Sequence, residues 1–325
     1  MSTNQIPVSI LTGFLGSGKT TLLNHLLLNR QEKKFAVIEN EFANYAFDSY
    51  LIDNRVSVLN TISSGCICCS KSSELLETLQ KMVDVKENFN HLIIESTGVS
   101  DPSQIIFTLF NEDFFIDYYI DAVICTVDVI HIDQFLLNTK EAAKQIGYAD
   151  VILLTKTDSV SQEKTHNVFE MMKQINPLAS IYISSHGFVA DADILNLKAF
   201  IPSNVEKKII DMKILDNGEN KVQHRIKSMC FDFDISFNFF ALKGMLETIS
   251  DIYGKNLFRI KGFIHVNDFS ERMIIQSVAD THVFQKGRKW DSFEKPITKL
   301  VFIGKELQRD LIQGLLERCL SNAYH

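Results

Sequence analysis

One octapeptide, Gly-Phe-Leu-Gly-Ser-Gly-Lys-Thr at 13–20, constrains the fold of this chain more than any other stretch. It fits the phosphate-loop pattern of a glycine, four further residues and then Gly-Lys-Ser/Thr. An apolar run over 6–11 precedes it and is typical of a buried strand, and leucines at helical spacing follow it over 20–28. A strand, a glycine-rich turn and a helix in this order predict a nucleotide-binding α/β sheet.

The chemistry of this loop follows from its residue types. Its glycines let the backbone curl, so that main-chain N–H groups and the start of the helix face phosphate oxygens. Lys19 would reach the β- and γ-phosphates, and the Thr20 hydroxyl would bind Mg²⁺. The alternative is a glycine-rich turn that binds nothing, but the motif and its context together favour nucleotide binding. The residues expected to bind the nucleotide here are Gly13, Gly16, Ser17, Gly18, Lys19, Thr20 and Thr21.

The bulk composition is that of an ordinary globular protein long enough for two domains. Of the 325 residues, 46% are hydrophobic and 22% are charged. The net charge of −7 disfavours nucleic acid as a partner. No apolar run approaches the ~20 residues that a membrane span needs. The first strand begins almost at once, without a basic-then-apolar leader, so we expect a cytoplasmic protein with no membrane partner.

Periodicity divides the chain into two domains. Apolar strands alternate with helical patterns through residues 1–203, which predicts a mostly parallel sheet with helices on both faces, as in phosphate-loop NTPases. A polar stretch over 204–223 is the expected linker. The strands expected before it are 6–11, 35–38, 55–62, 91–95, 122–129, 151–155 and 181–184.

The order of elements changes beyond the linker, in residues 224–325. Strands and helices there follow the order β-α-β-β-(β)-α, which predicts a smaller α+β domain of ferredoxin-like type. The expected elements are strands 225–235, 257–266, 272–279 and 299–303 and helices 239–249 and 305–320.

The functional motifs of the first domain all follow the carboxyl ends of predicted strands. In a parallel sheet these ends meet along one edge, where ligands bind. We therefore expect the phosphate loop to gather there with four further stretches. These are the acids Glu39 and Glu41, the cysteine motif 66–69, Glu95–Gly98 and Thr155–Asp158.

Thr155-Lys-Thr-Asp158 directly follows a buried strand and resembles the guanine-reading loop of GTPases. A carboxylate at Asp158 can accept two hydrogen bonds, from the N1–H and the 2-amino group of guanine. Adenine offers neither donor, so it would leave this carboxylate desolvated and unpaired. The Lys156 stem can lie along the base. The next strand is followed by Ser184–Gly187, which either caps the base or is an ordinary polar turn.

Glu95-Ser-Thr-Gly98 stands where nucleotide-hydrolysing proteins place a Walker B acid. Glu95 would hold Mg²⁺ through water or position the attacking water, which makes it a candidate catalytic residue with Lys19 and Thr20. Gly98 belongs to the turn that we expect to approach the nucleotide. The alternative is a capping acid beside a turn, but a carboxylate that ends an apolar run favours a function.

Cysteines crowd at Cys66, Cys68 and Cys69, a spacing too tight for a structural zinc knuckle. The motif lies just before a helix predicted from about residue 73, whose positive end favours thiolates. The ligands would be three thiolates, or two thiolates with a carboxylate from Glu39 or Glu41. Such a site suits Zn²⁺ best, with Co²⁺ or Ni²⁺ as alternatives. The remaining alternative is that these are buried or redox-active thiols.

Taken in order, these motifs resemble those of the CobW-type GTPases, metallochaperones of the SIMIBI class. The resemblance extends to Arg259–Gly262 and Lys299–Gly304 in the second domain, so it spans nearly the whole chain. It implies a GTPase domain followed by a C-terminal domain, weak GTP hydrolysis, and Zn²⁺ or Co²⁺ near the cysteine motif. The family usually continues Asn-Glu-Phe with Gly-Glu, whereas Ala43-Asn44 stands here. A carboxylate is missing at Asn44, which puts metal affinity or its coupling to the nucleotide in question.

The leading hypothesis is therefore a GTPase that delivers a transition metal, with zinc preferred, to a client metalloprotein. Its expected ligands and partners are GTP, Mg²⁺, the metal ion, the client and a second copy of the chain in a homodimer. Two alternatives remain. A small-molecule kinase would bind ATP in preference to GTP and would need an Arg-rich lid, which the sequence lacks. A nucleotide-dependent metal sensor without turnover would keep its activities after Lys19→Ala.

Overall fold

A computed structural model describes residues 5–30, 33–40, 56–62, 72–110, 116–184, 194–212, 226–278 and 280–321 of the chain. The chain divides into two compact units. The first unit comprises residues 1–172 and 179–199, and the second comprises residues 173–178 and 200–325. Each unit has its own sheet and its own core.

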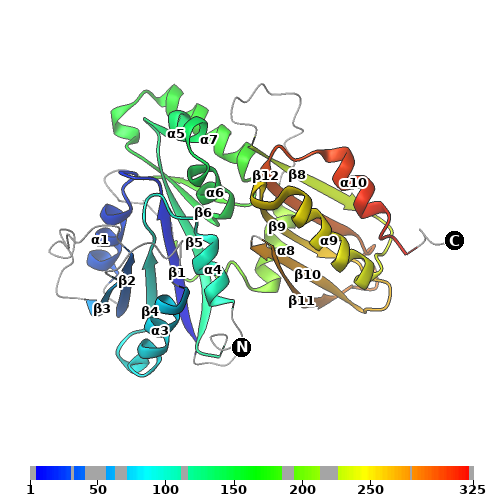
Figure 1. The fold of residues 1–325 in the computed structure, drawn as a ribbon, viewed down its shortest axis with the longest axis horizontal. Coiled ribbons are helices and arrows are strands. Elements are labelled where there is room, and N and C mark those ends of the chain that lie inside the picture. Colours follow the sequence, from blue (N-terminus) through cyan, green and yellow to red (C-terminus); the bar gives the residue numbers. More distant parts are fainter. Residues whose placement is uncertain are drawn as a thin grey trace. The chain divides into compact units, whose positions relative to one another are not determined.

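The described residues of the first unit form a seven-stranded parallel sheet (Figure 1). Its order, β3-β2-β4-β1-β5-β6-β7, places the strand that precedes the phosphate loop in the centre. The strands are β1 (Ile6–Gly13), β2 (Phe35–Asn40), β3 (Val56–Ile62), β4 (His91–Glu95), β5 (Tyr118–Asp128), β6 (Val151–Thr155) and β7 (Ser180–Ile183).

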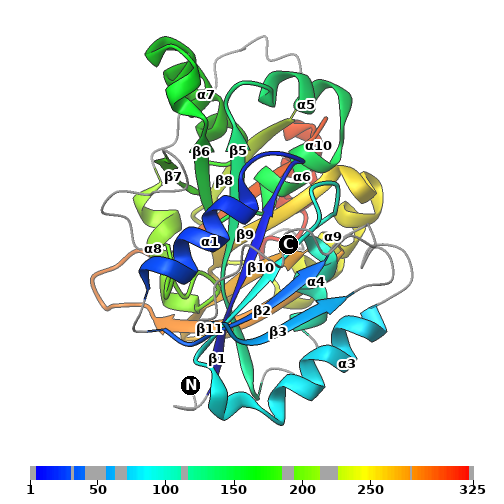
Figure 2. The ribbon, with the colours of Figure 1, turned by 90° about the vertical axis from the view of Figure 1, so that its left-hand side faces the viewer.

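Helices cover both faces of this sheet, with α1 on one side and α4 and α6 on the other (Figures 1 and 2). Leucines spaced along α1 pack against apolar residues of β1, β2, β4, β5 and β6, which gives this face of the sheet a hydrophobic core. No helix among the described residues is both long and apolar enough to cross a bilayer. The helices are α1 (Lys19–Asn29), α3 (Ser72–Val83), α4 (Ser103–Leu109), α5 (Ile132–Asn138), α6 (Glu141–Tyr148) and α7 (Gln162–Ile175), with short 3-10 turns η2 (Lys86–Asn88) and η3 (Thr157–Ser159).

All seven expected strands are present, and the one difference of note lies in β5. This strand begins at Tyr118, whereas the sequence predicted a start at Ala122. The acid Asp121 interrupts the apolar run in the sequence, so the predicted strand began after it. The pairing of β1 with β5 skips this residue, as in a β-bulge. The bulge leaves the Asp121 carboxylate facing Ser9 and the main-chain N–H of Lys198 inside the protein.

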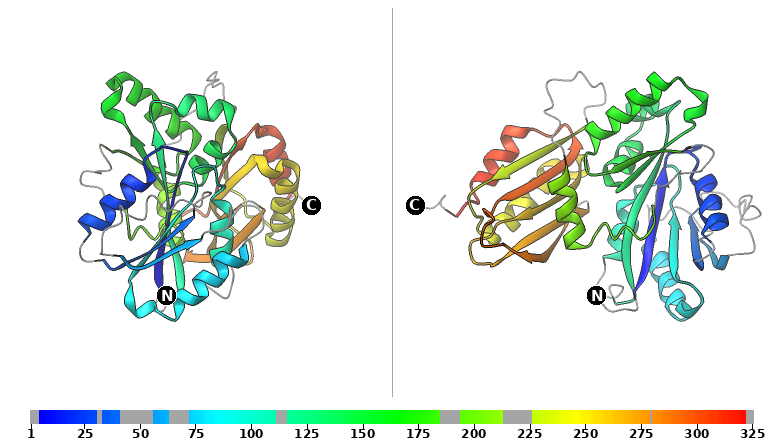
Figure 3. Two further views of the ribbon diagram at one scale, coloured as in Figure 1. Left: turned by 60° about the vertical axis from the view of Figure 1, so that its left-hand side comes forward. Right: turned by 180° about the vertical axis from the view of Figure 1, so that it is seen from behind.

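The second unit is built on a five-stranded antiparallel sheet of order β11-β10-β9-β12-β8 (Figure 3). β12 lies between β8 and β9 and runs antiparallel to both, so β8-α9-β9 is a split β-α-β unit. Helices α9 and α10 pack on the apolar face. The predicted fold class, a parallel phosphate-loop NTPase sheet with a smaller α+β domain, is confirmed. The elements are α8 (Pro202–Asp211), β8 (Ile226–Phe233), α9 (Phe239–Tyr253), η4 (Gly254–Asn256), β9 (Leu257–Ile264), β10 (Glu271–Val278), β11 (Thr281–Lys289), β12 (Thr298–Lys305) and α10 (Arg309–Glu317).

Two elements of the second unit were not predicted. Residues 204–211, expected as the start of a linker, lie in helix α8, and β11 was not expected at all. Both elements have few buried apolar residues. The spacing of such residues is the signal from which helices and strands are predicted. Residues 213–223, which make up most of the remaining expected linker, lie outside the described residues.

Candidate functional site

The phosphate loop joins β1 to α1, as the motif predicted. Its glycines adopt backbone angles that other residues rarely tolerate, with φ of 140° at Gly13, 69° at Gly16 and 97° at Gly18. Gly18 is the residue before the helix, so the first N–H groups of α1 face the curl of the loop. This arrangement of donors fits phosphate oxygens.

Neighbouring strands fix the position of this loop. A Cβ on Gly13 would lie 2.4 Å from the main-chain oxygen of Thr126 in β5, so only glycine fits there. The Ser17 hydroxyl lies 2.7 Å from that of Thr126. From β6, the buried hydroxyl of Thr155 donates to the carbonyl of Ser17 at 2.8 Å. The first residue of the predicted guanine-reading loop therefore supports the phosphate loop.

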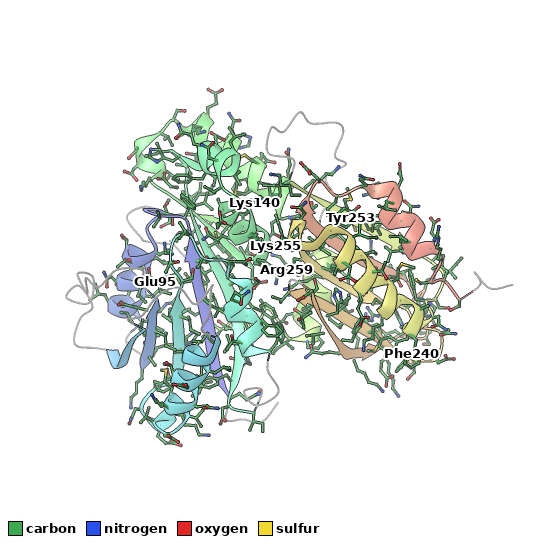
Figure 4. The ribbon with its side chains drawn as sticks, viewed as in Figure 1. Glu95, Lys140, Phe240, Tyr253, Lys255 and Arg259 are labelled. Carbon is green, nitrogen blue, oxygen red and sulfur yellow. The ribbon has the colours of Figure 1, made fainter. Side chains whose placement is uncertain are left out.

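The two reactive side chains of the motif are ordered on the same loop. The Lys19 ammonium donates to the carbonyl of Gly13 at 2.9 Å and approaches that of Phe14 at 3.4 Å. The Thr20 hydroxyl donates to Oε1 of Glu95 at 3.2 Å. Figure 4 shows Glu95 beside helix α1. The structure thus brings together all three candidate catalytic residues of the sequence.

Carboxylates line up across the strand ends beside the loop. Glu95 pairs in register with Leu11 of β1 on one side and with Glu39 of β2 on the other. Glu39 and Glu95 are 7% and 9% exposed, so both acids are buried next to the candidate phosphate site. β3, at the edge of the sheet, ends at Ile62 opposite Asn40.

The remaining predicted metal ligands, Glu41, Cys66, Cys68 and Cys69, lie outside the described residues. Among the residues that the structure does describe, no group of three or more His, Cys, Asp or Glu side chains could hold a metal ion. Glu39 is therefore the one predicted transition-metal ligand whose position can be stated.

The turn after Glu95 packs directly against the phosphate loop. A Cβ on Gly98 would lie 2.6 Å from the main-chain nitrogen of Leu15. From α6, the buried amide of Gln145 donates to the carbonyls of Gly98 at 3.2 Å and Ser100 at 3.1 Å. Lys144 pairs with Asp101 at the end of the same turn. The turn is thus held between α6 and the phosphate loop.

The predicted guanine-reading loop leaves β6 beside the end of β5. Asp158 is exposed in η3, where it accepts a hydrogen bond from Ser159. Lys156 reaches back to Asp128, the last residue of β5, with Nζ 2.9 Å from Oδ2. Ser184, at the end of β7, is buried, and residues 185–187 of the expected base cap lie outside the described part of the chain.

Sequence reasoning missed three residues of this site: Thr126, Asp128 and Gln145. Asp128 ends β5 as Glu95 ends β4, but the apolar run in the sequence continues to Val129, so the predicted strand placed this acid inside the strand. Thr126 and Gln145 contact the loops through tertiary hydrogen bonds, which no local pattern in the sequence announces.

A central strand, a glycine-rich loop, a helix that begins with Lys-Thr and a facing acid define the class of phosphate-loop NTPases. The CobW/HypB/UreG nucleotide-binding domain matches residues 7–183, and the C-terminal domain of the cobalamin synthesis protein CobW matches residues 226–320. The chain belongs to this CobW family.

Relatives match over nearly the full chain. The zinc chaperone YjiA of Escherichia coli is 35% identical over 96% of this chain and 98% of its own length. The zinc-regulated GTPase metalloprotein activator 1 of Dictyostelium discoideum is 32% identical over 97% of this chain and 80% of its own. A crystal structure of the Zn(II)-bound YjiA GTPase from E. coli has a TM-score of 0.77 at 29% identity and covers 98% of this chain and 99% of that one.

Proposed function

We propose that this protein hydrolyses GTP to control the binding of zinc and its delivery to a client metalloprotein. The chain is a GTPase, since relatives that match nearly its whole length are named as GTPases. The observation that carries the proposal is the register at the strand ends, where Glu39 lies next to Glu95 and Glu95 accepts the Thr20 hydroxyl. A predicted metal ligand is thus one strand away from the predicted catalytic acid.

The nucleotide half of the proposal assigns roles to the candidate nucleotide-binding and catalytic residues. The loop N–H groups and Lys19 bind the phosphates of GTP. Thr20 and Glu95 offer a hydroxyl and a carboxylate 3.2 Å apart, hard oxygen donors that suit Mg²⁺. When bound, Mg²⁺ would neutralise charge on the phosphates. Glu95 positions the attacking water, and Asp158 and Lys156 recognise guanine.

The metal half of the proposal rests on β2 and β3. Glu39, Glu41, Cys66, Cys68 and Cys69 are the proposed zinc ligands. Residues 63–65 alone separate the end of β3 from Cys66 in the chain, and β3 ends at the same edge of the sheet as β2. Thiolates with carboxylate oxygens suit Zn²⁺. The names of the relatives, a zinc chaperone and a zinc-regulated activator, support zinc over cobalt or nickel.

In this proposal the nucleotide site and the zinc site are energetically coupled. A γ-phosphate that shifts Glu95 also shifts its neighbour Glu39, so GTP and zinc each change the affinity for the other by the same factor. We expect the zinc Kd, measured by competition with a chelating dye, to differ about tenfold between the GDP form and a form with a non-hydrolysable GTP analogue. Equal zinc affinities in the two forms would remove the coupling.

Variants identify the ligands in the same assay. Cys68→Ser, Cys69→Ser and Glu39→Gln should each weaken zinc binding and reduce its dependence on the nucleotide. Cys230→Ser is the matched control, because this half-buried cysteine of β8 lies outside the nucleotide-binding domain. Zinc affinity that is unchanged in the variants of the 66–69 motif would reject this motif as the site.

The proposal includes a client metalloprotein, action in the cytoplasm and a homodimer as the GTP-bound assembly. Zinc transfer to an apo-protein that requires GTP hydrolysis, and that Lys19→Ala abolishes, is the expected behaviour towards a client. Light scattering with GDP and with the GTP analogue reports the oligomeric state, and a monomer in both forms would reject the homodimer.

A further inference from the structure

Asp128, the last residue of β5, is the centre of a cluster beside the predicted guanine-reading loop, which follows the neighbouring strand β6. Its side chain is 2% exposed. One carboxylate oxygen, Oδ2, accepts Lys156 Nζ and His131 Nδ1, each at 2.9 Å. The other accepts the main-chain N–H of Ile130 at 2.8 Å. Both oxygens of this buried acid are therefore hydrogen-bonded.

The charge state of Asp128 follows from these contacts. Burial alone would raise the pKa of its carboxyl group. The hydrogen bonds from His131, Lys156 and Ile130, with the positive charge of Lys156, outweigh this effect and hold the pKa below its ordinary value. Asp128 is thus a stable anion that faces the Lys156 ammonium.

Lys156 itself has an unusual backbone. Its φ of 58° lies in the left-handed region, which a residue with a Cβ adopts only where surrounding contacts hold it. Thr155 on one side is tied to the phosphate loop, and Asp158 follows in η3. The ion pair with Asp128 fixes the far end of the Lys156 side chain, and 40% of this side chain remains exposed.

The same cluster touches the phosphate loop through aromatic rings. The ring of Phe14, the second residue of the loop motif, lies 4.2 Å from that of Phe135 on α5. Phe135 in turn lies 6.0 Å from the ring of His131, measured between centroids. Asp128 therefore joins the loop expected to hold the phosphates to the loop expected to hold the base.

We propose that Asp128 is a positioning residue for guanine recognition. Its ion pair holds the Lys156 stem as a fixed wall along the purine base and so presents Asp158 to the N1–H and the 2-amino group. Because the Lys156 side chain is already ordered before the nucleotide binds, the free energy of binding does not include the entropy cost of ordering it. This inference rests on the proposed function, because it assumes that residues 155–158 read guanine.

Asp128→Asn tests the proposal while keeping an oxygen acceptor for Ile130. We expect the Kd for GDP and the KM for GTP to rise about tenfold, the weak binding of ATP to stay the same, and kcat at saturating GTP to stay within about twofold. The preference for GTP over ATP then falls about tenfold. Lys156→Met, which removes the ammonium and keeps the apolar stem, should reproduce this loss, and adding Asp128→Asn to it should cost little more.

Asp133→Asn is the matched control. Asp133 pairs with Lys164 between α5 and α7, and its side chain is 53% exposed. The variant removes a nearby Asp–Lys ion pair that does not involve residues 155–158, so it should leave nucleotide binding unchanged. An equal loss of GTP and ATP affinity in Asp128→Asn would mean a general structural effect and would overturn the proposal. Unchanged GDP binding, or additive losses in the double variant, would overturn it as well. A wild-type protein without GTP preference would instead reject the guanine assignment itself.

Discussion

Gly98 leaves no space for a side chain against Leu15, because a Cβ there would lie 2.6 Å from the main-chain nitrogen of Leu15 and 2.8 Å from its Cα. The neighbour is main chain, which moves only if the phosphate loop moves. The turn after the predicted Walker B strand and the phosphate loop are therefore in direct steric contact. A shift in one of these segments is transmitted to the other without a side chain between them.

Gly98→Ala should therefore weaken nucleotide binding. Relieving the overlap costs roughly 1–3 kcal/mol, and the loop displacement that accompanies it should raise the Kd for GDP by about tenfold or more. A fluorescent GDP analogue measures this Kd. Gly244→Ala on α9 is the control, since nothing lies within 4 Å of the added methyl group, and it should keep GDP affinity and stabilise the fold by about 0.5–1 kcal/mol. If Gly98→Ala bound GDP with wild-type affinity, the turn after Glu95 would be able to move without displacing the phosphate loop, and the prediction would be wrong.

Glu95→Gln should separate hydrolysis from binding. The amide oxygen still accepts the Thr20 hydroxyl, but the negative charge that suits Mg²⁺ and the attacking water is lost. We expect kcat for GTP to fall about 10²-fold while the Kd for GDP changes by less than about threefold. Single-turnover phosphate release measures the first quantity. A variant with normal kcat would leave Glu95 as a capping acid beside its turn.

Much of this site could be predicted because its residues stand at strand ends, where the chain must leave an apolar run. Glu95, Thr155 and the phosphate-loop motif all directly follow or end predicted strands, and they do meet at one edge of the sheet. Asp128 escaped prediction, although it ends β5, because no known motif surrounds it. The contact of Lys156 with it depends on the pairing of β5 with β6, which sequence spacing does not encode.

The two missed elements of the second unit have a common cause. α8 buries only Val205, Glu206 and Ile209, and β11 is an edge strand whose residues are half-buried or exposed. Edge strands, and helices that bury few apolar residues, are stabilised largely by contacts with distant segments. Their own sequences therefore show only a weak periodic pattern of apolar residues. In α8 such a contact is the ion pair between Glu206 and Arg272 of β10.

Arg272→Met should destabilise the protein through this ion pair. Arg272 is fully buried between Glu206 and Glu294, with its guanidinium 3.9 Å from the centre of the Trp290 ring. Removing it leaves the buried Glu206 carboxylate with Arg288 as its one ion-pair partner among the described residues, which should cost about 3–5 kcal/mol in the free energy of unfolding by urea.

The pair can be tested as a unit. Arg272→Met combined with Glu206→Leu removes both buried charges and should recover most of the loss. Arg309→Met is the control, because this exposed arginine also lies over an aromatic ring, 4.8 Å from the centre of Phe231, and its loss should cost about 1 kcal/mol or less. A double variant as unstable as the single one would mean that Arg272 acts through packing.

His91 should make the stability of the protein depend on pH. It is fully buried at the start of β4, with Nε2 2.9 Å from the Ser9 hydroxyl and Nδ1 3.2 Å from Lys33 Nζ. Burial, together with the positive charge of Lys33, lowers its pKa from 6.5 to about 3. Between pH 6.5 and about 3, His91 is therefore protonated in the unfolded chain but neutral in the folded chain. The stability contributed by the neutral imidazole is complete above pH 6.5 and is lost as the pH falls towards 3.

Urea unfolding at pH 7.5 and at pH 5 measures this effect. Linkage predicts that His91 alone makes the wild-type protein about 2 kcal/mol less stable at pH 5 than at pH 7.5. His91→Gln is less stable at pH 7.5, because the buried contacts are disturbed, but it should lack this part of the pH dependence. His166→Gln, on the exposed side of α7, should keep it. If His91→Gln lost as much stability between the two pH values as the wild type, another group would be responsible and the imidazole would titrate normally in the folded chain.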